Sequence, residues 1–125
     1  LAHAHAAFPP WDPPHPGRPT LVEVRPVHVA RTLFGICGYR DEDREGAQRA
    51  STRAGLLRAL RAAAKLEFEM EQAAQVVEDG QGDHVDAVLA ATAAAAAWAD
   101  GFQGVPSNVP RCEGWIHSVR EEPWR

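Results

Sequence analysis

Apolar and polar residues follow two different periods along this chain, and the period changes near glycines and prolines. Residues 20–24 (Thr-Leu-Val-Glu-Val) alternate and are mostly β-branched, which predicts a short strand ended by Pro26. Over residues 27–36 the apolar side chains recur every three or four positions, the spacing of a short amphipathic helix. The same spacing predicts a longer helix over residues 46–64.

The second half of the chain is predicted to be mainly helical. Residues 66–70 alternate briefly, but their helical surroundings favour one helix that continues to Val77. Residues 78–82 form a glycine-containing break, and a last helix is predicted over residues 83–100, ended by Gly101. A single strand cannot satisfy its own ladder of hydrogen bonds. The pattern therefore predicts a part of a larger α/β unit.

Composition divides the chain into three regions. Residues 1–19 contain six of the ten prolines and are predicted to form an extended arm or loop. Residues 20–118 carry the predicted elements of one small domain, and residues 119–125 form a tail.

Charge and cysteine content exclude several classes of protein. The net charge of -4 provides no overall attraction to nucleic acid, so any such role needs a local patch. Two cysteines, Cys37 and Cys112, are too few for a disulfide framework and indicate a reducing, cytoplasmic setting. Because no run of about 18 apolar residues exists, no membrane span is predicted.

Two aspartates at the start of the last predicted helix are the main candidate site. Asp83 and Asp86 are three residues apart and share one face of the first helical turn. They can act as an N-cap and a first-turn acid, which the helix macrodipole favours. Alternatively, the two carboxylates can hold Mg²⁺ or Mn²⁺, which prefer oxygen ligands. His84 points to another side of the helix and is expected at the surface.

Four short motifs carry a resemblance to a known family. The stretch 83–91 resembles the opening of the last catalytic helix in RuvC-type resolvases. The order of motifs over residues 20–118 is similar to a family of uncharacterised proteins predicted to be RNase H-like nucleases. Those motifs are Val22-Glu23-Val24-Arg25-Pro26, Leu33-Phe34-Gly35, Asp86-Ala87-Val88-Leu89-Ala90-Ala91 and Glu113-Gly114-Trp115-Ile116.

The resemblance implies an α/β, RNase H-like fold, of which this chain is the C-terminal, mostly helical part with one clear strand. It further implies hydrolysis of phosphodiesters with Mg²⁺ or Mn²⁺, with Asp83 and Asp86 as metal ligands and Asp86, Asp83 and Glu23 as catalytic residues. The family takes its first aspartate from a strand that precedes this region, so the acid set here is incomplete. The alternative is a non-catalytic helical module that docks on or completes another chain, with Asp83 and Asp86 as helix caps.

A basic stretch offers a candidate contact with nucleic acid. Phosphates could be bound by Arg49, Arg53, Arg58 and Arg61. No aromatic residue lies among them for base stacking, and a solvated helix face has the same composition. The other partner that the sequence predicts is a second chain, or a preceding N-terminal region, that completes the sheet.

Overall fold

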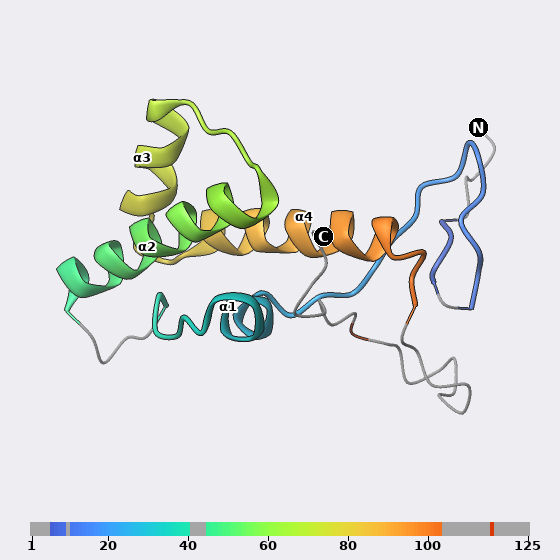
Figure 1. The fold of residues 1–125 in the computed structure, drawn as a ribbon, viewed down its shortest axis with the longest axis horizontal. Coiled ribbons are helices and arrows are strands. Elements are labelled where there is room, and N and C mark those ends of the chain that lie inside the picture. The colour runs from blue at the N-terminus through green and yellow to red at the C-terminus, as the bar shows by residue number, and fades with distance from the viewer. Residues whose placement is uncertain (1–5, 10, 41–44, 104–115, 117–125) are drawn as a thin grey trace.

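A computed structural model describes residues 6–9, 11–40, 45–103 and 116 of the chain. This part contains four helices: α1 (Pro26–Phe34), α2 (Gly46–Ala64), α3 (Met70–Glu78) and α4 (Asp83–Ala99). Figure 1 shows α2 and α4 along the length of the molecule, with α3 standing steeply at one end. The predicted helices over residues 27–36, 46–64 and 83–100 are confirmed to within two residues at each end.

Proline and glycine set the ends of α1. Pro26 occupies the start of the helix, where its missing N–H costs nothing because the first turn has no intrahelical acceptor for it. Gly35 ends the helix with a φ of 63°. The N–H groups of Gly35 and Ile36 then donate to Arg31 O and Ala30 O, at 3.0 and 3.3 Å. This left-handed ending satisfies carbonyl groups of the last turn.

The prediction of one helix running on to Val77 is wrong. α2 stops at Ala64, and Lys65 takes a left-handed φ of 52°. Residues 66–69 are not helical. Their alternation of apolar and acidic residues correctly indicated an extended backbone. Leu66 and Phe68 pack against the core, whereas the acidic residues between and after them are exposed. Only an extended backbone turns both apolar side chains inward at a spacing of two.

A capping box starts α3 after this extended connection. The Glu69 side chain accepts from the backbone of Gln72, and the Glu69 N–H donates to Gln72 Oε1 at 3.2 Å. Two otherwise unsatisfied donors are paired in this way.

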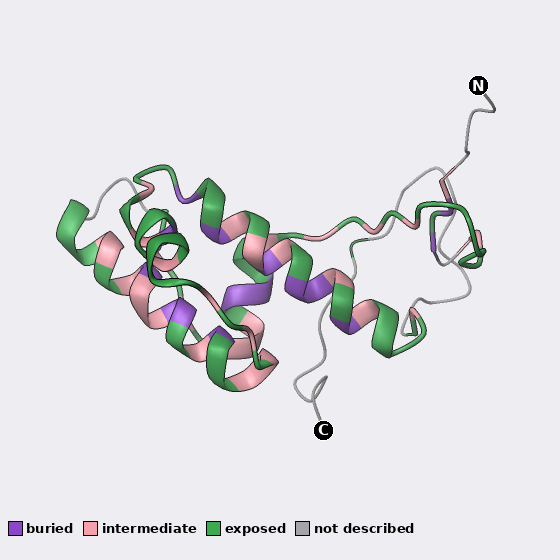
Figure 2. Ribbon diagram, turned by 90° about the horizontal axis from the view of Figure 1, so that it is seen from above, coloured by how far each residue is buried: buried purple, intermediate pink, exposed green. Residues whose placement is uncertain are grey.

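The core lies where the apolar faces of the four helices meet. α4 packs against α1 and α3, and α2 packs against α3 and α1. The buried faces of the helices appear purple in Figure 2. Each fully buried leucine stabilises the fold by about 1.5–3 kcal/mol relative to an exposed one. The core comprises Val29, Ala30, Tyr39, Leu56, Leu57, Leu60, Val76, Val85, Leu89, Ala93 and Ala96.

The predicted α/β, RNase H-like fold is wrong. Within the described residues there is no β-sheet, only two isolated parallel bridges, between Ala7 and Thr20 and between Glu23 and Ile116. α4 packs against α1 and α3 and has no sheet beside it among the described residues. Because the helices bury their apolar faces on one another, this part of the fold has a core without a sheet.

Residues 20–25, here called the extended segment, have the conformation of a strand. Among the described residues they form isolated bridges but no continuous ladder of hydrogen bonds with another strand. Exposure alternates along it: Leu21 is 50% exposed and Glu23 is exposed, whereas Val22 and Val24 are partly buried. Val24 packs against the helical core. The predicted strand therefore exists as a local conformation, with one face inward and one in solvent.

The proline-rich arm returns to the start of the extended segment. Ala7 N donates to Pro19 O at 2.8 Å, and Leu21 N donates to Ala7 O at 2.9 Å. The described residues between Ala7 and Pro19 form turns and loops and contain no helix, as the prolines predict. Among the described residues, no helix combines the length and the apolar character needed to cross a bilayer.

Candidate functional site

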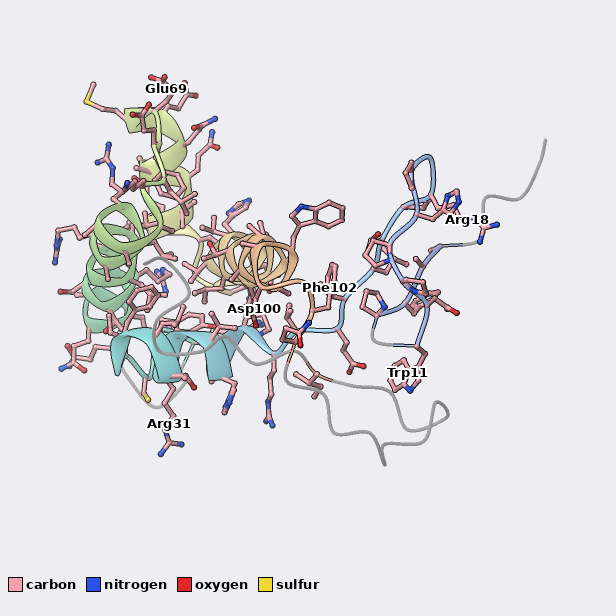
Figure 3. The ribbon with its side chains drawn as sticks, turned by 45° about the vertical axis from the view of Figure 1, so that its right-hand side comes forward. Trp11, Arg18, Arg31, Glu69, Asp100 and Phe102 are labelled. Atoms are coloured by element: carbon pink, nitrogen blue, oxygen red, sulfur yellow. The ribbon has the colours of Figure 1, made fainter. Side chains whose placement is uncertain are left out.

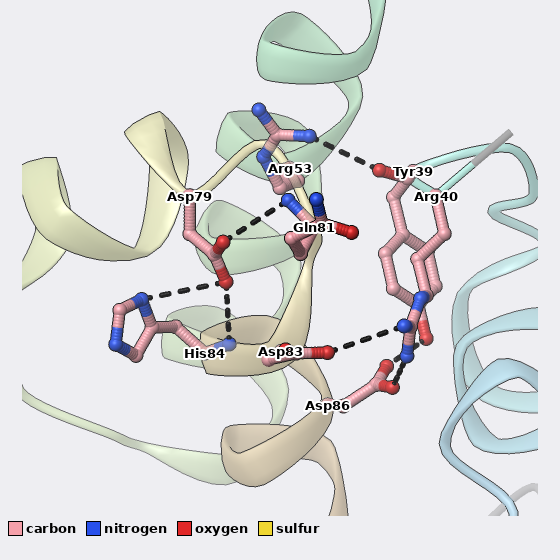
Figure 4. A network of polar contacts seen from close by, with 8 residues as sticks. All are labelled: Tyr39, Arg40, Arg53, Asp79, Gln81, Asp83, His84 and Asp86. Atoms are coloured by element: carbon pink, nitrogen blue, oxygen red, sulfur yellow. Dashed lines mark hydrogen bonds and ion pairs between the residues drawn. The ribbon is translucent and has the colours of Figure 1, made fainter. Parts of the chain in front are cut away.

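The start of α4 is capped by a residue that precedes both predicted site aspartates. Gly82 is the N-cap residue and provides no side chain for this purpose. Asp79 does so instead: its Oδ2 accepts from His84 N at 2.8 Å and its Oδ1 from Gln81 N at 3.0 Å (Figure 4). These backbone donors hold the pKa of Asp79 below its usual value, the bond from His84 contributing most. The side-chain capping expected of Asp83 is therefore provided by Asp79, while Gly82 holds the N-cap position.

Asp83 and Asp86 bind one arginine from the connection between α1 and α2. Arg40 Nη1 pairs with Asp86 Oδ2, and Arg40 Nη2 lies 3.1 Å from Asp83 Oδ1. The Tyr39 hydroxyl donates to Asp86 Oδ1 at 2.6 Å. The Asp86 side chain is 20% exposed and the Asp83 side chain 73% exposed. Asp86 is thus the enclosed member of the pair, with both carboxylate oxygens engaged.

Gly82 allows the backbone before α4 to lie close to Tyr39 and Arg40. Gly82 has a φ of 78°, a left-handed conformation that side chains rarely adopt. A Cβ at Gly82 would lie 2.8 Å from Arg40 Cγ and 3.5 Å from Tyr39 Cδ2. The backbone before α4 can therefore lie against the two residues that contact the aspartates.

The phenol of Tyr39 lies in an environment that opposes its ionisation. Burial raises the pKa of Tyr39 above its usual range, and the hydrogen bond to Asp86 and the negative charge of Asp86 raise it further. The positive charge of Arg40 acts in the opposite direction. In turn, the pKa of Arg40 is raised, chiefly by its attraction to Asp86. The contacts therefore favour a neutral phenol beside an ion pair.

We predict a loss of stability at alkaline pH that depends on Tyr39. The folded-state pKa lies above the unfolded value of about 10, so the contribution of Tyr39 is complete below pH ~10 and falls as pH rises beyond it. The free energy of unfolding, measured with urea between pH 8 and 11, should fall more steeply with pH for the wild type than for Tyr39→Phe. Tyr39 is the only tyrosine in the sequence, so phenolate absorbance reports its ionisation directly. Equal slopes in the two proteins would contradict the prediction.

As arranged here, the aspartate pair is a poor match to a metal site. A divalent cation would have to displace the Arg40 guanidinium from both carboxylates. Among the described residues, no group of three or more histidine, cysteine, aspartate or glutamate side chains could hold a metal ion. Mg²⁺ or Mn²⁺ binding stays a prediction, and these contacts give it no support.

Glu23, the third predicted catalytic residue, does not join the aspartates. It lies on the extended segment, which passes the C-terminal half of α4 in Figure 1, whereas Asp83 and Asp86 lie in the first turn of that helix. The fourth family-like motif falls mainly on residues 113–115, outside the described residues; Ile116 is described through its bridge to Glu23.

The four arginines proposed for phosphate contact do not form one exposed face. Arg53 is 3% exposed and donates from Nε to Val77 O at 2.8 Å and from Nη1 to Tyr39 O at 3.1 Å. Arg49 is partly buried, whereas Arg58 and Arg61 are exposed. Burial lowers the pKa of Arg53. Its guanidinium joins the end of α3 to the connection that carries Tyr39, and cannot reach a phosphate from there.

Sequence reasoning missed the three residues that organise this site. Asp79 carried a local signal, because an aspartate before glycines at a helix start is typical of a capping turn. Tyr39 and Arg40 carried none, since they meet Asp86 across 47 and 46 residues of sequence.

Comparison with known proteins identifies no relative. No family model matches the chain, and neither the curated proteins nor the solved structures include a match.

Proposed function

We propose that this chain is a non-catalytic helical module that docks onto another polypeptide through its extended segment. The main observation behind the proposal is that residues 20–25 have a strand conformation but belong to no sheet among the described residues. Residues 20–25 alternate in exposure as a strand does, yet the described residues offer them only the two isolated bridges. A strand edge of this kind binds an extended peptide through main-chain hydrogen bonds.

The environment of Asp86 supports the non-catalytic part of the proposal. Tyr39 and Arg40 account for both of its carboxylate oxygens, so no ligand is needed to explain a partly buried charge. Asp83 and Asp86 then stabilise the first turn of α4 and fasten it to the α1–α2 connection. The exposed, free Cys37 supports a reducing compartment, which we take to be the cytoplasm.

A short peptide that can pair as a β-strand tests the proposed docking. The probe is a capped seven-residue peptide in which threonine and valine alternate, added to the full chain. We expect slower hydrogen exchange at the amides of residues 20–25 and weaker binding by Val22→Pro, because proline removes a backbone donor. Leu21→Thr changes an exposed side chain but keeps the backbone, and should bind as the wild type does. Unchanged exchange at millimolar peptide would refute the docking.

A metal titration tests the absence of catalysis. Wild type and Asp86→Asn are titrated with Mn²⁺ and assayed for cleavage of single- and double-stranded DNA and RNA. The proposal expects neither protein to bind Mn²⁺ measurably or to cleave. Mn²⁺ binding by the wild type that Asp86→Asn abolishes would instead support the nuclease interpretation.

A further inference from the structure

Residues 13–18 of the proline-rich arm form an exposed sequence that ends in an arginine. They read Pro-Pro-His-Pro-Gly-Arg, with two prolines three positions apart and the arginine two positions after the second of these. Every one of these residues is exposed. Figure 3 shows Arg18 projecting from the arm, apart from the helices. The proline rings and the guanidinium are therefore accessible from solvent together.

Local sterics favour an extended backbone over the first half of this sequence. Proline fixes φ at about −65°, and a residue that precedes proline is driven out of the helical region. Pro13 and His15 both precede prolines, and residues 13–15 are neither helix nor strand in the structure. These preferences are those of the polyproline II helix, which has three residues per turn. In that helix Pro13 and Pro16 lie on one edge, as the rings of proline-rich ligands do in aromatic grooves.

A turn centred on Pro16 and Gly17 interrupts this course. Arg18 N donates to His15 O at 3.1 Å, and Gly17 has a φ of 82°, as in a type II turn. The His15 ring adds a hydrogen bond from Nδ1 to Pro16 O at 2.7 Å. Both bonds are exposed, so water replaces them when the turn opens. The turn and Trp98 line a hollow of about 450 Å³, so little packing opposes the opening.

We propose that residues 13–18 open from this turn and dock as a polyproline II segment into a groove of aromatic side chains bordered by carboxylates, of the kind that SH3 domains present. The proline rings stack on the aromatic side chains, and the Arg18 guanidinium pairs with a carboxylate at the border of the groove. Proline restricts the segment before it binds, so little conformational entropy is lost. Residues 20–25 take no part in this contact, which is independent of the docking proposed above.

Calorimetric titration of the full chain with a set of isolated SH3 domains, all with acidic groove borders, tests the docking. We expect saturable binding that Arg18→Gln and Pro13→Ala each weaken by about fivefold to tenfold. Arg31→Gln is the matched control, because Arg31 is exposed on α1 and points away from the helices (Figure 3). It should bind as the wild type does. Absence of binding to every domain at millimolar concentration, or an equal loss in Arg31→Gln, overturns the proposal.

Neutralising the groove identifies the partner of the arginine. In an SH3 domain whose border carboxylates are changed to amides, the wild type and Arg18→Gln should bind with the same affinity, because the charged pair is already lost. A loss of affinity in Arg18→Gln that is unaffected by neutralising the groove would contradict the assigned pair.

Gly17→Ala tests whether the turn must open. Alanine strains the positive φ that the turn requires, whereas an extended backbone accepts it, and no atom lies within 4 Å of the added Cβ. We expect binding to tighten by up to about fivefold, because the extended form becomes more populated. Gly35→Ala is the control: Gly35 also has a positive φ and open surroundings but ends α1, so affinity should not change. Unchanged or weaker binding by Gly17→Ala overturns the proposed opening.

Discussion

Replacing Arg53 with methionine is expected to lower the free energy of unfolding by about 2–4 kcal/mol. Methionine retains much of the packing volume of the arginine stem but donates no hydrogen bond. The carbonyl oxygens of Val77 and Tyr39 would each lose a charged donor, at present 2.8 and 3.1 Å away. Because Arg53 is 3% exposed, water cannot readily replace those donors.

Arg58→Met is the matched control for this change. Arg58 lies on the same helix but is exposed, so its replacement should change stability by no more than about 0.5 kcal/mol. Urea unfolding followed by circular dichroism measures both variants. Equal stability of the two would show that Arg53 is not the buried link between α3 and the α1–α2 connection.

The second large effect is expected at Asp86. Asp86→Ala removes the acceptor of the Tyr39 hydroxyl and the closer partner of Arg40, and should destabilise the fold by about 1.5–3 kcal/mol. Asp83→Ala removes a carboxylate that is 73% exposed, where ion pairs contribute about 0–1 kcal/mol. The two aspartates, equivalent in the sequence motif, should therefore differ clearly in chemical denaturation.

A different pattern would favour the metal interpretation. If Asp83 and Asp86 were joint metal ligands in an otherwise solvated site, both substitutions would leave the metal-free protein equally stable. Mn²⁺ would then raise the melting temperature of the wild type alone. A large effect confined to Asp86 and independent of Mn²⁺ fits a structural ion pair.

Periodicity predicted the helices well, and the reason is local. Pro26 and Gly35 act on their own backbone, so the ends of α1 follow from residue type alone. The wrong helix prediction over residues 66–69 also has a local cause. Two apolar residues at a spacing of two were assigned to the neighbouring helical period, although Leu66 and Phe68 needed an extended backbone to face inward together.

The sequence located the two aspartates of the candidate site but not the residues that contact them. Asp83 and Asp86 do share one face of a first helical turn, as their spacing predicts. Spacing says nothing about what faces that turn. Tyr39 and Arg40, which contact Asp86 through a hydrogen bond and an ion pair, come from a distant connection that only packing brings near.

The sequence by itself determined α1, α2 and α4, the proline and glycine boundaries of α1, and the strand-like conformation of residues 20–24, because each depends on neighbours within a few residues. Only the tertiary structure decided that α4 packs on α1 and not on a sheet, that Arg53 is buried, and that Asp86 is neutralised by Arg40. These outcomes depend on which faces meet after the chain has folded. A pair of aspartates therefore predicts an acidic turn, and its surroundings decide its chemistry.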